Sequence, residues 1–219
     1  MNTVSRLVAA AVFGAASLSA NAELQARPGG MVYDTVQNIT WLADLNYAKT
    51  SGAIPSGATF QDGRLSWGMA NSWASDLVYG GFDDWRLPKA LNPNGTGPCL
   101  GFRCSGSELG HLFYAELGVS AGDPVSDATN VANLGLFTNI QSDFYWSGTE
   151  LPSSLGTRHF YWIFRMDNGA QYDMEDYYAL FAVAVHDGDV AAAVPEPQTN
   201  AMLLAGLGAL ALVLQRRKR

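Results

Sequence analysis

The stretch NSWASDLVYGGFDDWRLP, residues 71–88, holds the end of an amphipathic helix and a compact motif of charged and aromatic residues. Trp73 and Leu77 continue a near-helical apolar spacing, and Ser66 is a suitable N-cap for this helix. The Gly80-Gly81 pair is expected to end it. One apolar stripe of the helix therefore faces a core.

The motif Asp83-Asp84-Trp85-Arg86 allows two interpretations. In the first, Trp85 offers a flat apolar face to a pyranose ring, and the neighbouring charges hydrogen-bond the hydroxyl groups of the sugar. In the second, which we favour, Trp85 and Leu87 anchor the core, because large aromatic side chains dominate core energetics. Arg86 would then pair with a carboxylate such as Asp83 or Asp84. These four motif residues are the candidate ligand-binding residues.

A second helix is expected downstream, where apolar residues recur at helical spacing up to Leu117. Ser105 and Glu108 have the spacing of a capping box, and Gly118 provides a stop.

The two cysteines, Cys99 and Cys104, lie in the loop 89–104 before this helix. In an oxidising exported compartment a local disulfide is favoured. A zinc site is disfavoured because zinc takes four ligands, and the first histidine in the vicinity is His111. The disulfide would fasten the loop to the start of the second helix.

The C-terminal third has the pattern of a β-rich region. Phe160, Trp162, Phe164 and Met166 alternate along one expected strand, and Asp167-Asn168-Gly169 offers a tight hairpin turn. The almost unbroken apolar run 177–185 is typical of a strand that is covered on both faces. The expected strands are 31–34 and 39–42, which form a hairpin, and then 145–149, 160–166 and 177–185.

The acidic residues after the hairpin turn, Asp173, Glu175 and Asp176, could hold calcium through oxygen ligands together with the turn itself. They lack the EF-hand spacing and the Glu-Pro-Asn signature of calcium-dependent lectins. A hairpin turn with solvated charges is therefore the favoured interpretation, and neither a metal nor a cofactor is expected.

The histidines His111, His159 and His186 are the only ones in the chain. No nucleophile motif, zinc-protease motif or phosphate loop accompanies them. Each is expected to be a surface or edge residue, and the chain is not expected to be an enzyme. A paired-carboxylate glycosidase stays open as an alternative, because such a site is defined by distance in space.

The N-terminus has the pattern of a secretory signal peptide, expected over residues 1–22. Arg6 precedes an apolar run at 7–18, and Ala20-Asn21-Ala22 has the small-x-small pattern of a cleavage site. Cleavage is expected between Ala22 and Glu23.

The C-terminus combines Val194-Pro195-Glu196-Pro197 with an apolar run at 201–214 and four cations at 216–219. The run would form about 21 Å of helix, which is short of the roughly 30 Å hydrocarbon core of a bilayer. The basic cluster would stay on the cytoplasmic side. We expect a linker at 191–200 and a hydrophobic helix with a basic tail at 201–219, which insert only transiently into the inner membrane.

Residues 23–194 carry 8 Lys and Arg against 19 Asp and Glu, so their net charge is −11. This length suits one domain with a real core, expected over 23–190. The acidic charge argues against nucleic acid and anionic membranes as partners.

Four segments in the order of the chain resemble the family related to the C-terminal domain of the Lcl collagen-like adhesin. They are residues 71–88, SELGHLFYAELG (107–118), YWSGTE (145–150) and YYALFAVAVHDGDV (177–190). The resemblance covers nearly all of 31–190. It implies an α+β, C-type-lectin-like fold in which two helices pack on a twisted antiparallel sheet.

This sequence departs from the family pattern at two places. The family has a Glu-Leu pair soon after WRLP, whereas here the insertion 89–106 separates Pro88 from Glu108-Leu109. The last strand of the family ends in Arg, whereas this chain has His186.

The tail is similar to the PEP-CTERM sorting signal. This resemblance implies a Gram-negative exporter, recognition by an exosortase-type membrane protease and a cell surface rich in exopolysaccharide. The expected function is that of a non-enzymatic surface or biofilm-matrix protein that binds or packs among extracellular polysaccharide. The alternatives are a structural surface protein without a glycan ligand and a carbohydrate-active enzyme.

Overall fold

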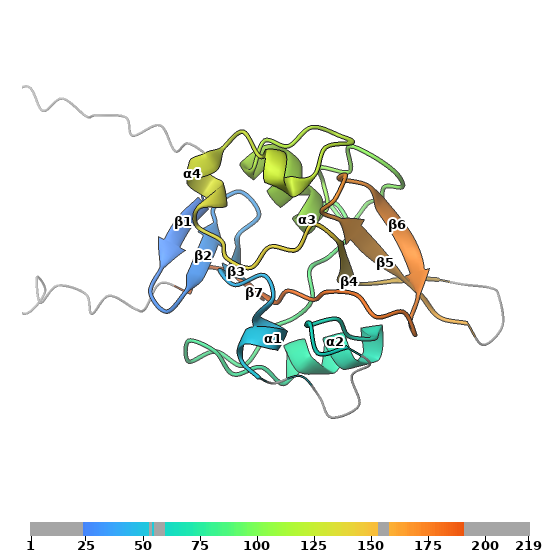
Figure 1. The fold of residues 1–219 in the computed structure, drawn as a ribbon, viewed down its shortest axis with the longest axis horizontal. Coiled ribbons are helices and arrows are strands. Elements are labelled where there is room, and N and C mark those ends of the chain that lie inside the picture. The colour runs from blue at the N-terminus through green and yellow to red at the C-terminus, as the bar shows by residue number, and fades with distance from the viewer. Residues whose placement is uncertain (1–23, 53, 55–59, 153–157, 191–219) are drawn as a thin grey trace, which may run out of the picture.

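A computed structural model describes residues 24–52, 54, 60–152 and 158–190. Within these residues, short helices surround two antiparallel sheets, with strand orders β1-β2-β3-β7 and β4-β5-β6 (Figure 1). The fold is mixed α and β as expected, but the expectation of one sheet is wrong. The signal peptide, its cleavage site Ala22-Glu23, the motif Val194–Pro197 and the tail 201–219 lie outside the described residues.

The first sheet is built around the expected N-terminal hairpin, which the structure confirms. Met31 pairs with Leu42 and Asp34 with Ile39, and a short turn joins the two strands. The outer neighbours are an N-terminal strand on one side and a C-terminal strand on the other. The strands are β1 (Leu24–Arg27), β2 (Met31–Asp34), β3 (Ile39–Leu42) and β7 (Val185–Asp187).

The second sheet is a three-stranded meander of β4 (Phe144–Leu151), β5 (Phe160–Arg165) and β6 (Gln171–Glu175). The hairpin turn expected at 167–169 joins β5 to β6, and the φ of Gly169 is 80° there. A side chain at Gly169 would collide with Tyr114 and Phe113, so glycine is needed both for its φ and for the space.

The apolar run 177–185 crosses the molecule between the two sheets (Figure 1). Only its last residue lies in a strand, β7, so the expectation of one regular strand is wrong. The expected burial on both faces holds for 180–185 but not for Tyr177 and Tyr178, which are exposed. Phe181, Val183 and Val185 pack into one core cluster, and the alternate residues Leu180, Ala182 and Ala184 pack into the other. Isolated bridges to Leu65, Tyr145 and Arg86 hold the run in place.

The first expected helix is α2 (Trp67–Ser75), which follows the short α1 (Tyr47–Thr50). It buries Ala70, Trp73 and Ala74, as the apolar stripe predicts. The helix ends before Gly80-Gly81. These glycines instead form a tight turn, in which Tyr79 and Phe82 exchange backbone hydrogen bonds and both glycines have positive φ.

The second expected helix has two parts, α3 (Glu108–His111) and a π-helical turn, η1 (Leu112–Glu116). Ser107 caps it by accepting a hydrogen bond from the Gly110 amide, so the expected capping box of Ser105 and Glu108 is wrong. A 3₁₀ turn, η2 (Val125–Asp127), and a short helix, α4 (Val131–Leu134), follow.

The tryptophans belong to the core. Trp67, the sixth, is half-buried and stacks on Tyr161 with ring centroids 3.5 Å apart. The five buried tryptophans are Trp41, Trp73, Trp85, Trp146 and Trp162. In the described residues, the tryptophans therefore form no exposed platform for a glycan.

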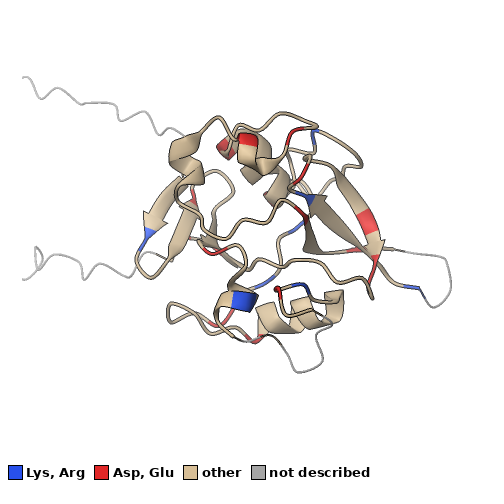
Figure 2. Cartoon of the chain, in the orientation of Figure 1, with Lys and Arg blue, Asp and Glu red and all other residues tan. Residues whose placement is uncertain are grey.

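Acidic positions outnumber basic ones along the ribbon and lie on helices and strands alike (Figure 2). Most of these groups are exposed or half-buried, but Asp34, Glu108 and Glu116 are buried. Buried carboxylates are rare unless they are paired or hydrogen-bonded, so we expect each of these three to have a specific polar partner.

Candidate functional sites

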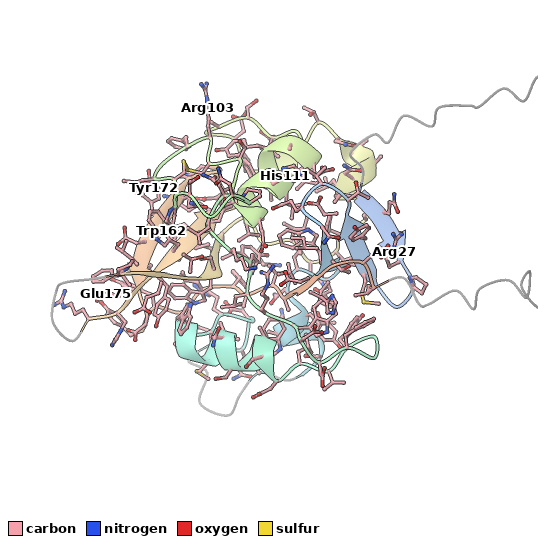
Figure 3. All side chains as sticks on the ribbon, turned by 180° about the vertical axis from the view of Figure 1, so that it is seen from behind. Arg27, Arg103, His111, Trp162, Tyr172 and Glu175 are labelled. Carbon is pink, nitrogen blue, oxygen red and sulfur yellow. A yellow bond between two sulfur atoms is a disulfide. The ribbon has the colours of Figure 1, made fainter. Side chains whose placement is uncertain are left out.

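Polar and aromatic side chains gather at three places. Figure 3 shows two of them well separated: His111 lies at the end of α3, and Glu175 lies at the end of β6. The remaining place is centred on Arg86, between the first sheet and α3.

Arg86 lies in an extended segment that exchanges two backbone hydrogen bonds with Val185. Its guanidinium donates to both oxygens of Glu108, each at 2.8 Å, and also to Asp187. Such a bidentate pair is strong and geometrically specific. Burial alone would lower the pKa of Arg86, but the hydrogen bonds to Glu108 and Asp187 outweigh it and raise that pKa. The hydrogen bond from Arg86 lowers the pKa of Asp187.

The motif Asp83–Arg86 follows the favoured core-anchor interpretation at Trp85 and differs from it in the partners of Arg86. Trp85 is only 2 % exposed, so its ring cannot stack on a sugar, and the core-anchor interpretation fits the structure. Arg86 pairs with carboxylates as expected, but its partners are Glu108 and Asp187 and not Asp83 or Asp84. Asp83 is exposed, and Asp84 pairs with His186 at 2.8 Å.

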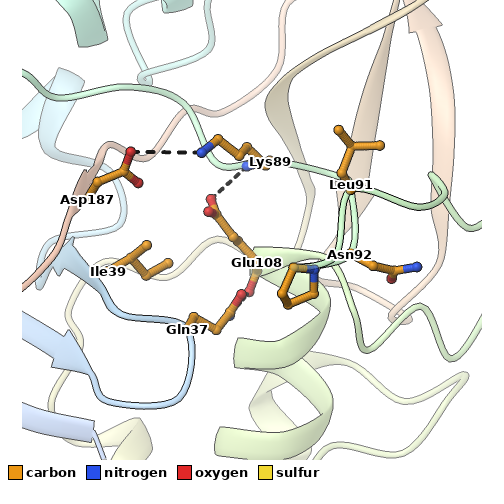
Figure 4. A pocket seen from close by; sticks show the side chains of 9 residues that line it. Gln37, Ile39, Lys89, Leu91, Asn92, Glu108 and Asp187 are labelled. Atoms are coloured by element: carbon orange, nitrogen blue, oxygen red, sulfur yellow. Dashed lines mark hydrogen bonds and ion pairs between the residues drawn. The ribbon is translucent and has the colours of Figure 1, made fainter.

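A pocket of about 340 Å³ opens beside this ion pair (Figure 4). Lys89 spans its rim: its amide donates to Glu108 at 2.7 Å, and its ammonium lies 3.8 Å from Asp187. The acidic groups of the pocket are thus already engaged by cations. The lining residues are Gln37, Ile39, Lys89, Leu91, Asn92, Pro93, Gly95, Glu108 and Asp187.

The disulfide between Cys99 and Cys104 is present, with an S–S distance of 2.10 Å. As expected, it fastens the loop to the start of the second helix, because the Cys104 carbonyl accepts hydrogen bonds from the amide and hydroxyl of Ser107. The loop also attaches to the second sheet. The Gln171 side chain donates to the Cys99 carbonyl at 2.8 Å.

The second place is a surface formed by Tyr177 and Tyr178, which we call the tyrosine surface. The two rings are 65 % and 45 % exposed and stack on each other, with centroids 4.6 Å apart. Hydrogen bonds to Tyr178 and Glu175 raise the pKa of Tyr177. A hollow of about 390 Å³ adjoins the rings. It is lined by Arg158, Phe160, Asp173, Met174, Glu175, Tyr177 and Tyr178.

The calcium interpretation of the same acidic region finds little support. Asp167 pairs with Arg165 at 2.6 Å, and Glu175 pairs with Arg158 at 2.7 Å. The Asn168 side chain accepts a hydrogen bond from the Ala170 amide inside the turn. This is the favoured alternative, a hairpin turn whose charges are paired or solvated.

The third place is a buried cluster of Asp34, His111 and Glu116. His111 Nε2 lies 3.1 Å from Glu116 Oε1 and 3.9 Å from Asp34 Oδ2. Burial and the charge of Asp34 raise the pKa of Glu116. His111, expected at the surface or at an edge, is half-buried between two buried carboxylates. Sequence patterns missed this cluster because its residues come from β2, from α3 and from the end of η1.

The other two histidines differ in burial. His159 is exposed near Glu150, as expected for a surface residue. His186 is buried, its ring lies against Phe82 and Trp85, and its Nε2 pairs with Asp84. The expectation of an edge position holds for the backbone of His186, near the end of β7, but not for its side chain.

Residues 193–218 match the PEP-CTERM protein-sorting motif. The match includes the Val194–Pro197 motif and supports export to the cell surface and processing by an exosortase, a membrane protease. No curated protein and no solved structure matches the chain. Membership of the Lcl-related family and a C-type-lectin-like fold thus have no support from these comparisons. Among the described residues, no helix is long and apolar enough to cross a membrane.

Proposed function

We propose that this chain is a non-enzymatic surface protein that binds extracellular polysaccharide through the tyrosine surface. The observation that carries the proposal is the exposed, stacked pair Tyr177 and Tyr178 beside a hollow with polar groups. The PEP-CTERM match supports the surface location at which such a ligand is available.

The chemistry of the tyrosine surface suits a sugar. Aromatic rings offer apolar faces to the C–H groups of a pyranose, and their edges carry hydroxyl groups that hydrogen-bond. Asp173 and Glu175 lie in the same hollow and supply acceptors for sugar hydroxyls. The stacking of Tyr177 on Tyr178 orients the two rings before a ligand arrives.

A neutral polysaccharide is the best candidate. Residues 23–194 have a net charge of −11, which repels polyanions, and the Arg158 guanidinium in the hollow is paired with Glu175. A neutral chain of sugars would meet aromatic faces and acceptors without that electrostatic cost.

Binding of the full chain to a panel of neutral and acidic polysaccharides tests this proposal. Replacing both tyrosines, Tyr177→Ala with Tyr178→Ala, should weaken binding to neutral polysaccharide by about tenfold or more. Phe102→Ala is the matched control, because Phe102 is also an exposed aromatic and lies beside the opposite end of β6. Equal binding by both variants, or no binding by the parent chain to any polysaccharide, would reject the proposal.

Processing is a separate test. We expect the mature surface form to lack the residues that follow Val194–Pro197. Intact-mass spectrometry of surface protein that still carries residues 201–219 would contradict this expectation.

A further inference from the structure

We propose that Asp34, His111 and Glu116 form a structural binding site for a divalent transition-metal ion, represented here by Zn²⁺. One ligand atom from each of the three side chains lies within 4.8 Å of the other two. The inference is independent of carbohydrate binding, because His111 on α3 lies away from Glu175 on β6 (Figure 3).

The distances suit a metal ion of this size. Zinc binds imidazole nitrogen and carboxylate oxygen at roughly 2.0–2.2 Å, so its tetrahedral ligands are separated by roughly 3.3–3.6 Å. His111 Nε2 is 3.1 Å from Glu116 Oε1 and 3.9 Å from Asp34 Oδ2. Small rotations of the side chains would bring all three atoms to coordinating distance.

The charge of the cluster calls for a cation. Asp34 is 0 % and Glu116 is 4 % exposed, and within the described part of the chain His111 is the only residue that forms an ion pair with either. Even with a protonated imidazole, two buried carboxylates leave a net negative charge. Buried charge without compensation is costly, and a bound dication would remove that cost.

The remaining polar atoms hold the carboxylates in a ligand-like orientation. Asp34 Oδ1 accepts hydrogen bonds from the backbone amides of Val36 and Gln37, each at 2.9 Å. Asp34 Oδ2 faces His111 and accepts a longer hydrogen bond, 3.4 Å, from the side-chain Nε2 of Gln37. Glu116 Oε2 accepts from Asn133 at 3.1 Å, while Oε1 faces the imidazole. Such outer partners, which fix the orientation of the ligating carboxylates, are typical of metal centres.

The π-helical turn makes the site possible. In an α-helix, residues five apart point about 140° away from each other around the axis. His111 and Glu116 are five apart, and η1 contains the wider hydrogen bond from the Leu117 amide to the Leu112 carbonyl. The wider turn brings both side chains to the same side, and π-turns of this kind recur at functional sites.

The donor set favours a transition metal over calcium. Calcium takes six to eight oxygen ligands, whereas one imidazole with two carboxylates suits zinc and its neighbours. The ion would join β2 to the helix that carries Glu116, and Asn133 would extend this link to α4. A fourth position stays available for water, since the His111 side chain is 16 % exposed.

The test uses the full chain in detergent, stripped of metal with EDTA and then given Zn²⁺. We expect one zinc per chain after dialysis and a rise in Tm of about 5–10 °C at free zinc near 100 times Kd. Glu116→Gln and His111→Gln should lose this rise, whereas the control His159→Gln should keep it. An unchanged rise in the first two variants, or no rise in the parent chain, would overturn the proposal.

A measurement without substitutions covers the case in which a variant fails to fold. Zinc should move the ¹⁵N resonance of His111 Nε2 in the parent chain and leave the resonances of His159 in place. X-ray absorption should show nitrogen and oxygen ligands without sulfur. A sulfur ligand, or zinc that moves His159 and not His111, would place the ion elsewhere and reject the site.

Discussion

Glu108 and Glu116 lie at opposite ends of one helical segment and are equally hidden, at 7 % and 4 % exposure. Glu108 meets a guanidinium with both oxygens, whereas Glu116 meets a histidine and lies close to a second carboxylate. The first cluster is compensated by the chain itself, and the second is not. A buried carboxylate can therefore stabilise the fold where a cation of the chain pairs with it, as at Glu108. Where no such cation is present, as at Glu116, it favours binding of a cation from outside.

The largest effect should come from removing the cation of the compensated cluster. Arg86→Met leaves Glu108 buried without its partner, and breaking such a buried pair costs about 3–5 kcal/mol. Denaturant unfolding measures this loss. The double variant Arg86→Met with Glu108→Gln should recover part of it, and a double variant no more stable than Arg86→Met would show that the pair is not the cause.

The two glutamates should respond in opposite directions to the same substitution. Glu108→Gln weakens the pair with Arg86 and should lower the free energy of unfolding by about 2 kcal/mol. Glu116→Gln removes one of two neighbouring buried charges, so without metal at neutral pH it should raise that free energy by about 1 kcal/mol. Changes of the same sign in both variants would erase the distinction between the clusters.

Asn133 offers a finer test of the second cluster. Asn133→Ala frees Glu116 Oε2 but leaves all three proposed ligands in place. We expect zinc affinity to fall by about tenfold, as for other outer partners of metal ligands. Isothermal titration calorimetry measures the change, with Asn168→Ala as a control in the turn between β5 and β6.

The smallest effect should be the dependence of stability on pH in metal-free protein. The pKa of Asp187 is held below its ordinary value of 3.8 by Arg86, so its contribution is present above that value and is lost as the pH falls through the folded pKa. The exposure of Asp187 keeps this contribution small.

Glu116 should behave in the opposite way. Its pKa is raised above the ordinary 4.5 by burial and by the charge of Asp34, with Asn133 and His111 as the other groups that face it. Its contribution is therefore fully present below 4.5 and is lost as the pH rises through the folded pKa. The measurement is Tm against pH in EDTA. Glu116→Gln should reduce the loss of Tm as the pH rises above 4.5, and Arg86→Met should reduce only the loss of Tm at acid pH.

Local patterns predicted the elements that local physics controls. The hairpin of β2 and β3, the turn at 167–169 and the apolar stripe of α2 follow from residue spacing and turn chemistry. The two-sided burial of 180–185 also follows from its composition, whereas the exposure of Tyr177 and Tyr178 does not.

Pairings across the chain could not be predicted in this way. The acidic partners of Arg86 are 22 and 101 residues away, whereas Asp83 and Asp84 are adjacent in sequence but point elsewhere. The spacing of His111 and Glu116 matches no face of a regular helix, and only the π-turn makes them neighbours. The separation into two sheets depends on the same long-range contacts.

The crossing run 180–185 also bears on when the protein folds. Both core clusters need its side chains, and β3 needs β7 as its partner. These residues end only a few positions before the sorting motif at 193–218. Neither half of the core is complete until they have emerged on the outer side of the membrane. We therefore expect an exported chain of this design to complete its fold only as translocation ends.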